Sequence, residues 1–344
     1  GFSDDGACLE GVSYWNYGFG MFCFYYELLG EREPEALKIF QREKVRQIAL
    51  FYQRACLDDA IAVTFADCQP EARYSLRLMC FLKRIYGDAV KIPPLYYRIP
   101  MRKQKLPDML RSFTAYRPEF LSEKIQEFAH FFPQSGMYTC KTKDYCFAAK
   151  GGHNDEPHNH NDVGSFLFVK GGRQVLCDIG VGFYTKDYFD PATRYQLLGN
   201  GSQGHSVPIL SGHFQRPGRE YAARSVEFCD GHLSMDILGA YGMEGSLIRH
   251  FYLEEGGVRL KDEFHLSQKQ TNIVERFISY EEPKLEEGAL VWENAALRFD
   301  KDAVDFSVSK ESYYNNFKGT FDVWLLDFTL KDRDKIQSVE FFMQ

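Results

Sequence analysis

The sequence lacks any apolar run of the roughly 18 to 20 residues that a membrane-spanning helix needs. It also lacks an excess of positive charge, because 48 acidic residues outnumber 41 basic residues and leave a formal net charge of -7. That balance argues against a nucleic acid or a membrane surface as partner. We find no repeat of fixed period and no low-complexity tract, which argues against fibrous and disordered architectures.

Nine cysteines are present without a single Cys-x-x-Cys pair. An odd number in this spacing indicates reduced thiols rather than a disulfide framework. Cys80 and Cys177 lie inside apolar runs, as small core residues do. Reduced thiols favour a cytoplasmic location. The chain opens on Gly1 without an initiator methionine, so we expect an upstream region, and a periplasmic or secreted location stays open.

Two hydrophobic patterns divide the chain into a helical part and a β part. A content of 44% hydrophobic and 16% aromatic residues over 344 positions can bury a large core and predicts two domains. Residues 1–132 carry two stripes at helical spacing, Leu37, Phe40, Val45, Ile48, Phe51 and Leu78, Phe81, Leu82, Ile85. From about Met137, short alternating runs with turn signals predict a large antiparallel β-sandwich over residues 133–344. Pro133 marks the expected boundary.

Residues 151–165 form a very polar stretch that leads directly into an apolar run. The stretch reads Gly-Gly-His-Asn-Asp-Glu-Pro-His-Asn-His-Asn-Asp-Val-Gly-Ser and contains three of the nine histidines. This composition indicates a binding or catalytic loop held against a buried strand. In an extended chain His158 and His160 point the same way, so both can face one site. Either both bind one metal ion, or one binds metal while the other is free for acid–base work.

Two residues further along the chain are candidates for the same site. If Gly171-Gly172 closes a β-hairpin, the apolar run that ends at Asp178 returns toward His160. His205 follows a Gly-rich polar loop and precedes another strand-like run. His160, Asp178 and His205 together offer nitrogen and oxygen donors that suit zinc. A turn role for Asp178 and a hydrogen-bonded structural role for His205 are the alternatives.

Three segments of the chain follow one another in an order that is typical of a known family. They are His158-Asn-His160-Asn-Asp162-Val-Gly-Ser-Phe, Asp178-Ile-Gly-Val-Gly-Phe-Tyr-Thr185, and His205-Ser-Val-Pro208 with Gln215 beyond. The order and the spacing resemble those of the heparinase II/III-like family of polysaccharide lyases. The resemblance implies that His158 is catalytic and that His160, Asp178 and His205 hold a structural zinc ion. It also implies that residues 1–132 are the C-terminal portion of an incomplete α/α toroid, followed by the β-sandwich.

A second informative stretch, Glu10-Gly-Val-Ser-Tyr14-Trp-Asn-Tyr17, lies near the N-terminus. Tyr14 and Tyr17 share a face if a helix has begun there, and ordinary aromatic packing explains that spacing equally well. The resembling family carries a similar Glu-Gly-x-x-Tyr signature ahead of a helix, and its tyrosine donates a proton. The resemblance therefore implies that Tyr14 is catalytic, with Tyr17 the second choice. Glu10 and Tyr17 are expected near the substrate.

Three polar residues of the β part are expected to bind substrate as well: Asn159, Arg194 and Gln215. The guanidinium of Arg194 can bind a uronate carboxylate bidentately, although a solvated surface charge is the ordinary role of an arginine. The resemblance implies β-elimination of a uronic-acid-containing, glycosaminoglycan-like polysaccharide, with tyrosine and histidine dividing the proton transfers. The expected partner is thus an acidic polysaccharide, and a homodimer is left open.

Two functions of other classes remain as alternatives. One is a non-catalytic polysaccharide-binding fragment, because the resembling family places a further catalytic Asn or His on a helix upstream of the tyrosine. The other is a cupin-like metal enzyme in which His158 and His160 are both ligands.

Overall fold

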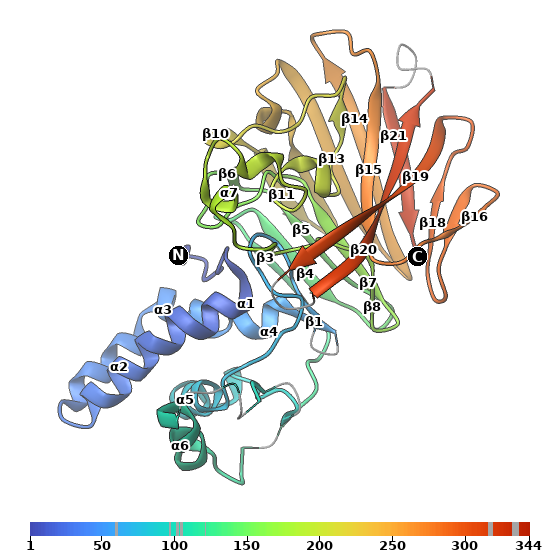
Figure 1. Cartoon of the computed structure of the whole chain (residues 1–344). Helices are drawn as coiled ribbons and strands as arrows, with labels where there is room; N and C mark the ends of the chain where they lie inside the picture. Colours follow the sequence, from blue (N-terminus) through green and yellow to red (C-terminus); the bar gives the residue numbers. More distant parts are fainter. Residues whose placement is uncertain are drawn as a thin grey trace.

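The computed structural model describes residues 1–58, 61–95, 98–100, 103, 106–120, 122–315, 319–331 and 337–344. Helices gather in the first third of the chain and antiparallel strands fill most of the rest (Figure 1). No helix among the described residues combines the length and the apolarity that crossing a membrane requires. All nine cysteines are free thiols, and eight of them are buried, which agrees with their expected place in the core.

Among the described residues, the helical part consists of short elements. They are α1 (Gly11–Tyr14), the π-helical turn η1 (Trp15–Phe19), α2 (Gly20–Gly30), the 3-10 helix η2 (Pro34–Gln41), α3 (Glu43–Ala49), α4 (Phe51–Ala55), α5 (Leu76–Tyr86), η3 (Gly87–Ala89) and α6 (Leu106–Ala115). A small hairpin of β1 (Cys56–Asp58) and β2 (Ile61–Ala62) separates α4 from α5.

The second predicted apolar stripe is helix α5, in which Leu78 and Phe81 are buried. The first stripe is not one helix. It is divided among η2, α3 and α4, because Arg42 is extended with ψ of 131° and interrupts the helical backbone. α5 packs against α2 and α6, but these helices alone do not define a toroid, which stays a prediction.

The β part contains three larger sheets. A five-stranded sheet has the order β3 (Phe128–Phe132), β4 (Met137–Lys141), β5 (Cys146–Lys150), β7 (Phe166–Lys170), β8 (Arg173–Leu176). An eight-stranded sheet has the order β11 (Arg224–Cys229), β12 (His232–Asp236), β13 (Gly245–Glu254), β14 (Gly257–Leu266), β21 (Ser338–Met343), β18 (Ala296–Phe299), β17 (Ala289–Val291), β16 (Lys284–Glu286). A four-stranded sheet has the order β19 (Val304–Asn315), β20 (Gly319–Leu330), β15 (Ile273–Ser279), β9 (Ile209–Leu210).

The remaining elements are short and belong to the loops around the site. β6 (His153–Asn154) pairs with β10 (Gly218–Ala222). Single turns of helix are α7 (Lys186–Phe189), η6 (Arg194–Gln196), η7 (Ser202–Gly204) and η8 (Leu238–Tyr241). β3 begins at Phe128, and Pro133 lies in the turn between β3 and β4, so the five-stranded sheet starts before the boundary that Pro133 was expected to mark.

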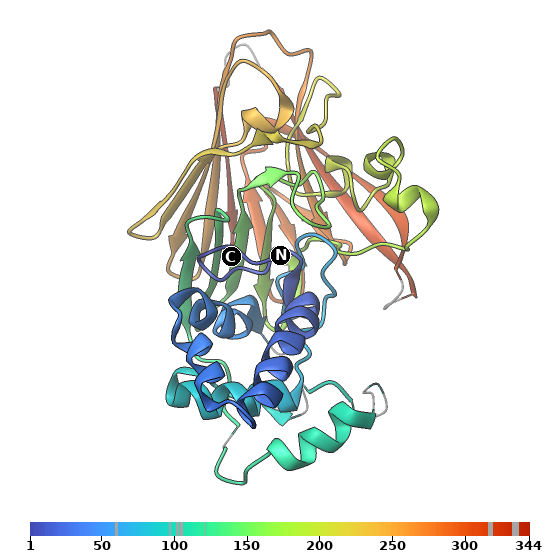
Figure 2. The ribbon, with the colours of Figure 1, turned by 90° about the vertical axis from the view of Figure 1, so that its left-hand side faces the viewer.

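The five-stranded sheet is the central layer of the molecule. Successive side chains of a strand point to opposite faces. Phe147 and Phe166 accordingly pack toward the eight-stranded sheet, whereas Ala148 and Leu167 pack into the core shared with the helices. Figures 1 and 2 show the green strands of this sheet between the blue helices and the yellow-to-red strands. Loops at the end of the central layer therefore lie where helical and β parts meet.

The hairpin predicted at Gly171-Gly172 is confirmed. Strands β7 and β8 pair antiparallel, with Lys170 opposite Arg173. Gly171 and Gly172 have φ of 58° and 74°, and a two-residue hairpin turn of this kind needs positive φ at both positions. The turn brings Asp178, just beyond β8, back to the end of the sheet from which the loop 151–165 leaves.

Candidate active site

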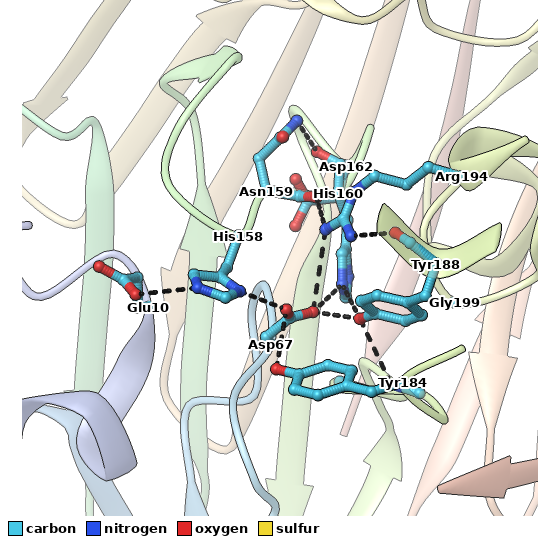
Figure 3. Close-up of polar contacts among 12 residues, drawn as sticks. Glu10, Asp67, His158, Asn159, His160, Asp162, Tyr184, Tyr188, Arg194 and Gly199 are labelled. Carbon is cyan, nitrogen blue, oxygen red and sulfur yellow. Dashed lines mark hydrogen bonds and ion pairs between the residues drawn. The ribbon is translucent and has the colours of Figure 1, made fainter. Parts of the chain in front are cut away.

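Six segments converge at the junction of the helical and β parts. The loop between β5 and β7 supplies His158 and His160, the segment after β8 supplies Asp178, and the residue after η7 is His205. From the helical part, Glu10 lies just before α1, Tyr14 is the last residue of α1, and the loop after β2 supplies Asp67. The segment around α7 adds Tyr184 and Tyr188 (Figure 3).

His160, Asp178 and His205 form a fully buried cluster. Each offers one ligand atom, and these atoms lie within 4.8 Å of one another. Nδ1 of His205 is 2.8 Å from Oδ2 of Asp178, and the rings of His160 and His205 have centroids 5.2 Å apart. The backbone N–H of Gly180 donates to the other oxygen of Asp178 at 3.0 Å. The convergence predicted for the three residues is therefore confirmed.

The hydrogen bonds of the cluster leave suitable atoms for a metal ion. His160 donates Nε2–H to Asp67 at 3.0 Å, and its buried Nδ1 has no hydrogen-bond partner among the described residues. His205 can donate Nε2–H to the carbonyl of Gly199 at 3.1 Å, which directs its Nδ1 at the carboxylate of Asp178. A neutral imidazole presents a lone pair there, and a cation would join it to the carboxylate. Two imidazole nitrogens and one carboxylate fit zinc.

Burial and charge shift the pKa values of the cluster in different directions. Burial lowers the pKa of His160 and outweighs the opposing effect of Asp67. Burial would also lower the pKa of His205, but Asp178 outweighs it and raises that pKa. Burial would raise the pKa of Asp178, but His205 and then His160 hold it below its ordinary value. His160 is thus neutral near pH 7, which is the form that binds metal.

His158 lies at the open side of the same loop. Its Nδ1 is 2.7 Å from Oδ2 of Asp67, its Nε2 is 3.7 Å from Glu10, and its side chain is 32% exposed. The hydrogen bond that His158 donates to Asp67 raises the pKa of His158, against the effect of burial. The backbone is left-handed here, with φ of 55°, rather than extended as the spacing predicts. Both imidazoles nevertheless reach one carboxylate.

Asp67 is the centre of the site and carries no motif that predicts it. Besides the two histidines, Tyr184 donates its hydroxyl to Asp67 at 3.0 Å, and Tyr188 donates to it as well. Burial would raise the pKa of Asp67, but hydrogen bonds from His158 and His160 outweigh burial and hold it well below its ordinary range. The available signal is an acidic residue within the apolar run Val63-Thr-Phe-Ala-Asp67-Cys68, since a buried carboxylate needs partners.

Tyr14 and Glu10, which the resemblance assigns to catalysis and to the substrate, lie beside His158. The rings of Tyr14 and His158 have centroids 4.9 Å apart, and the Tyr14 hydroxyl is 3.2 Å from that of Tyr184. Tyr17 takes part in none of these contacts and is 72% exposed. The shared face expected for Tyr14 and Tyr17 is lost because the turn Trp15–Phe19 is π-helical, which changes the angular spacing of side chains.

Arg194, Asn159 and Gln215 are buried and bond to neighbouring groups of the protein. Arg194 donates to the carbonyls of Tyr188 and Asn159, both at 2.7 Å. Asn159 accepts a hydrogen bond from the Tyr195 hydroxyl at 3.1 Å. The side-chain amide of Gln215 donates to the carbonyl of Val163 at 2.7 Å and accepts from the backbone N–H of Val163 at 3.0 Å. These bonds hold the histidine loop from inside, and a role of the three residues in substrate binding stays a prediction.

Comparison with solved structures identifies the fold. A heparan sulfate lyase HepC mutant from Pedobacter heparinus aligns with a TM-score of 0.68 at 14% identity, over 100% of this chain and 53% of that chain. A heparinase III gene product with methylated lysines gives 0.67 at 13%, over 99% and 52%. Another heparinase III structure gives 0.66 at 15%, over 99% and 54%.

The chain therefore has a heparinase-like lyase fold and spans about half the length of these solved chains. At such identities the likeness establishes the fold, whereas the chemistry has to be argued from the site. No family model and no curated protein sequence matches the chain.

Proposed function

We propose that this chain carries the active site of a polysaccharide lyase that cleaves a uronic-acid-containing polysaccharide by β-elimination. One observation carries the proposal. Tyr14 from the helical part and His158 from the β part face each other with ring centroids 4.9 Å apart, and Asp67 is bonded to His158 directly and to Tyr14 through Tyr184. Two groups that transfer protons are thus held side by side at an accessible edge.

β-Elimination needs two proton transfers and no water. The proton on C5 of the uronate is removed, the electron pair of that bond forms a double bond between C4 and C5, and the bond from C4 to O4 breaks. The departing O4 takes up a proton. The C5 carboxylate must be neutralised or hydrogen-bonded as charge develops, because the C5 proton is only weakly acidic.

His158 and Tyr14 can divide this work. The Nδ1–H of His158 is held by Asp67, so Nε2 lies at the partly exposed edge of the site, 3.7 Å from Glu10, where it can remove the C5 proton or bind the C5 carboxylate. Tyr14 donates the proton to O4, or acts as base as well if both transfers occur on one face of the sugar. Positioned acid–base groups of this kind typically contribute about 10² to 10⁴ in rate.

His160, Asp178 and His205 would hold a structural zinc ion. When bound, zinc supplies a cross-link among three loops, since an elimination that consumes no water gives a zinc-activated hydroxide no task. The link would tie the His160 loop to the segment after β8, and Asp67 would pass that rigidity on to His158. The group of close donor atoms includes His160 and not His158, which favours this division over a cupin-like site with both histidines as ligands.

The test is to incubate the chain with heparan sulfate, heparin, hyaluronate and alginate and to follow the ultraviolet absorbance of an unsaturated product. Heparan sulfate comes first, because a solved structure of the same fold is a heparan sulfate lyase. We expect absorbance to grow with one polymer and to stay flat with Tyr14→Phe. Binding of a polymer without new absorbance would favour a non-catalytic polysaccharide-binding chain instead.

A further inference from the structure

Arg249 on β13 is a fully buried cation that takes no part in the proposed chemistry. Its Nη1 donates to two backbone carbonyls, that of Gly164 at 2.9 Å and that of Ser206 at 2.8 Å. Gly164 closes the loop that carries His160, and Ser206 directly follows His205. One nitrogen of one side chain therefore joins the two loops that supply the histidines of the buried cluster.

Two carboxylates hold the other side of the guanidinium. Nε lies 2.9 Å from Oδ1 of Asp262, the residue opposite Arg249 on β14. Nη2 donates to Asp262 at 2.5 Å and to Glu275 of β15 at 2.9 Å. Burial would lower the pKa of Arg249, but Asp262 and then Glu275 outweigh burial and raise it. The cation is permanent, and strands of two different sheets fix its plane.

We propose that Arg249 is a positioning residue that sets the spacing between the His160 loop and the His205 loop, and through that spacing the zinc affinity of the cluster. The inference rests on the structural zinc of the proposed function. Its physical basis is the planar fork of donors, which can hold carbonyls on one side and carboxylates on the other.

A buried ion network is weak evidence for stability, because apolar replacements of similar volume are often neutral or stabilising. What such a replacement cannot reproduce is the direction of two hydrogen bonds to two separate loops. Partners that orient metal ligands from behind typically contribute about 10- to 100-fold to metal affinity. Changing Arg249 should consequently lower the zinc affinity of the cluster without a matching loss in the stability of the fold.

The experiment measures zinc dissociation constants by competition with a chelator, using the full chain and its Arg249→Lys variant. Lysine keeps a cation for Asp262 and Glu275 but lacks the fork. Leu297→Ala is the matched control, because it opens a cavity in the same eight-stranded sheet on β18, away from β13. The visible absorption spectrum of bound Co²⁺ reports the ligand geometry of each variant.

We expect Arg249→Lys to bind zinc about 10- to 100-fold more weakly, with an altered Co²⁺ spectrum. Leu297→Ala should lower the melting temperature and leave both readouts unchanged. If Arg249→Lys fails to fold, Arg249→Met combined with Asp262→Leu and Glu275→Leu replaces the network by apolar groups and should show the same loss. Wild-type affinity and spectrum in the folded variant would overturn the role of Arg249. A wild-type chain without zinc affinity would instead overturn the structural zinc, and this inference with it.

Discussion

His158 and His160 are separated by one residue and have opposite surroundings. The side chain of His158 is 32% exposed, whereas that of His160 is completely buried. Asp67 raises the pKa of His158, and burial lowers that of His160. Two histidines of one loop are thus suited to different roles, His158 to acid–base work and His160 to metal binding. The backbone is left-handed at His158, and the two imidazoles bond to different oxygens of Asp67.

The comparison shows that one carboxylate can serve both tasks. Each oxygen of Asp67 holds one imidazole, at 2.7 Å for His158 and 3.0 Å for His160. The two bonds direct the other nitrogen of His158 toward Glu10 at the partly exposed edge and leave the other nitrogen of His160 buried without a hydrogen-bond partner among the described residues. Substitutions of His158 should therefore affect activity, and substitutions of His160 should affect metal binding.

The largest expected effect comes from His158→Ala. Loss of a positioned acid–base group should reduce lyase activity by about 10² to 10⁴. The melting temperature and the zinc content should hardly change, because His158 lies outside the buried cluster. The matched control is His232→Ala, which removes a histidine from the eight-stranded sheet and should leave activity unchanged. An active His158→Ala enzyme would contradict the catalytic assignment.

Asp67→Asn should impair both His158 and His160, and with them both turnover and zinc affinity. The amide cannot accept hydrogen bonds from both imidazoles, so we expect about 10- to 100-fold losses in both turnover and zinc affinity. Turnover is measured with saturating polysaccharide and zinc affinity by chelator competition. A loss of turnover with unchanged zinc affinity would show that Asp67 serves His158 alone.

His205→Ala should directly impair zinc binding by the buried cluster of His160, Asp178 and His205. Removing a ligand should abolish stoichiometric zinc and lower the melting temperature by roughly 5 to 10 °C, because metal binding is coupled to folding. Activity should fall indirectly as the His160 loop loosens. Metal analysis and thermal unfolding are measured on the same preparation. Stoichiometric zinc with an unchanged melting temperature would remove His205 from the site.

A smaller effect is expected from His130, whose surroundings make the free energy of unfolding depend on pH. His130 on β3 packs on the ring of Phe132, and burial, then Arg54, lowers its pKa from 6.5 to about 4. A lowered histidine pKa stabilises the fold above pH 6.5, and that contribution is lost as the pH falls from 6.5 toward 4. After allowance for partial exposure, the loss should be about 1 to 2 kcal/mol.

Urea unfolding at pH 7 and pH 4.5 checks this expectation for the wild type and His130→Phe. The wild type should lose more free energy of unfolding than the variant between the two pH values. Equal losses would show that His130 titrates alike in the folded and unfolded chains.

Local rules explain what the sequence predicts correctly. The turn at Gly171-Gly172 fixes the return of Asp178, and the spacing of polar loops before apolar runs brings His205 to the same place. Each of these predictions depends on a short segment with a definite backbone geometry.

Long-range pairing explains what the sequence does not show. Asp67 lies 91 residues before His158, and no spacing rule relates the two. Arg194 and Gln215 stand in polar loops and look exposed, but both fold inward to bond backbone groups. The apolar stripe from Leu37 to Phe51 is consistent with one helix, and the extended backbone at Arg42 breaks it.

The most direct test of the division between the two histidines is the zinc content of His158→Ala and His160→Ala, purified side by side and checked for folding by circular dichroism. Elemental analysis should find about one zinc per chain in His158→Ala and none in His160→Ala. Loss of zinc from both variants would contradict the account, because it would make His158 a metal ligand rather than a free acid–base group.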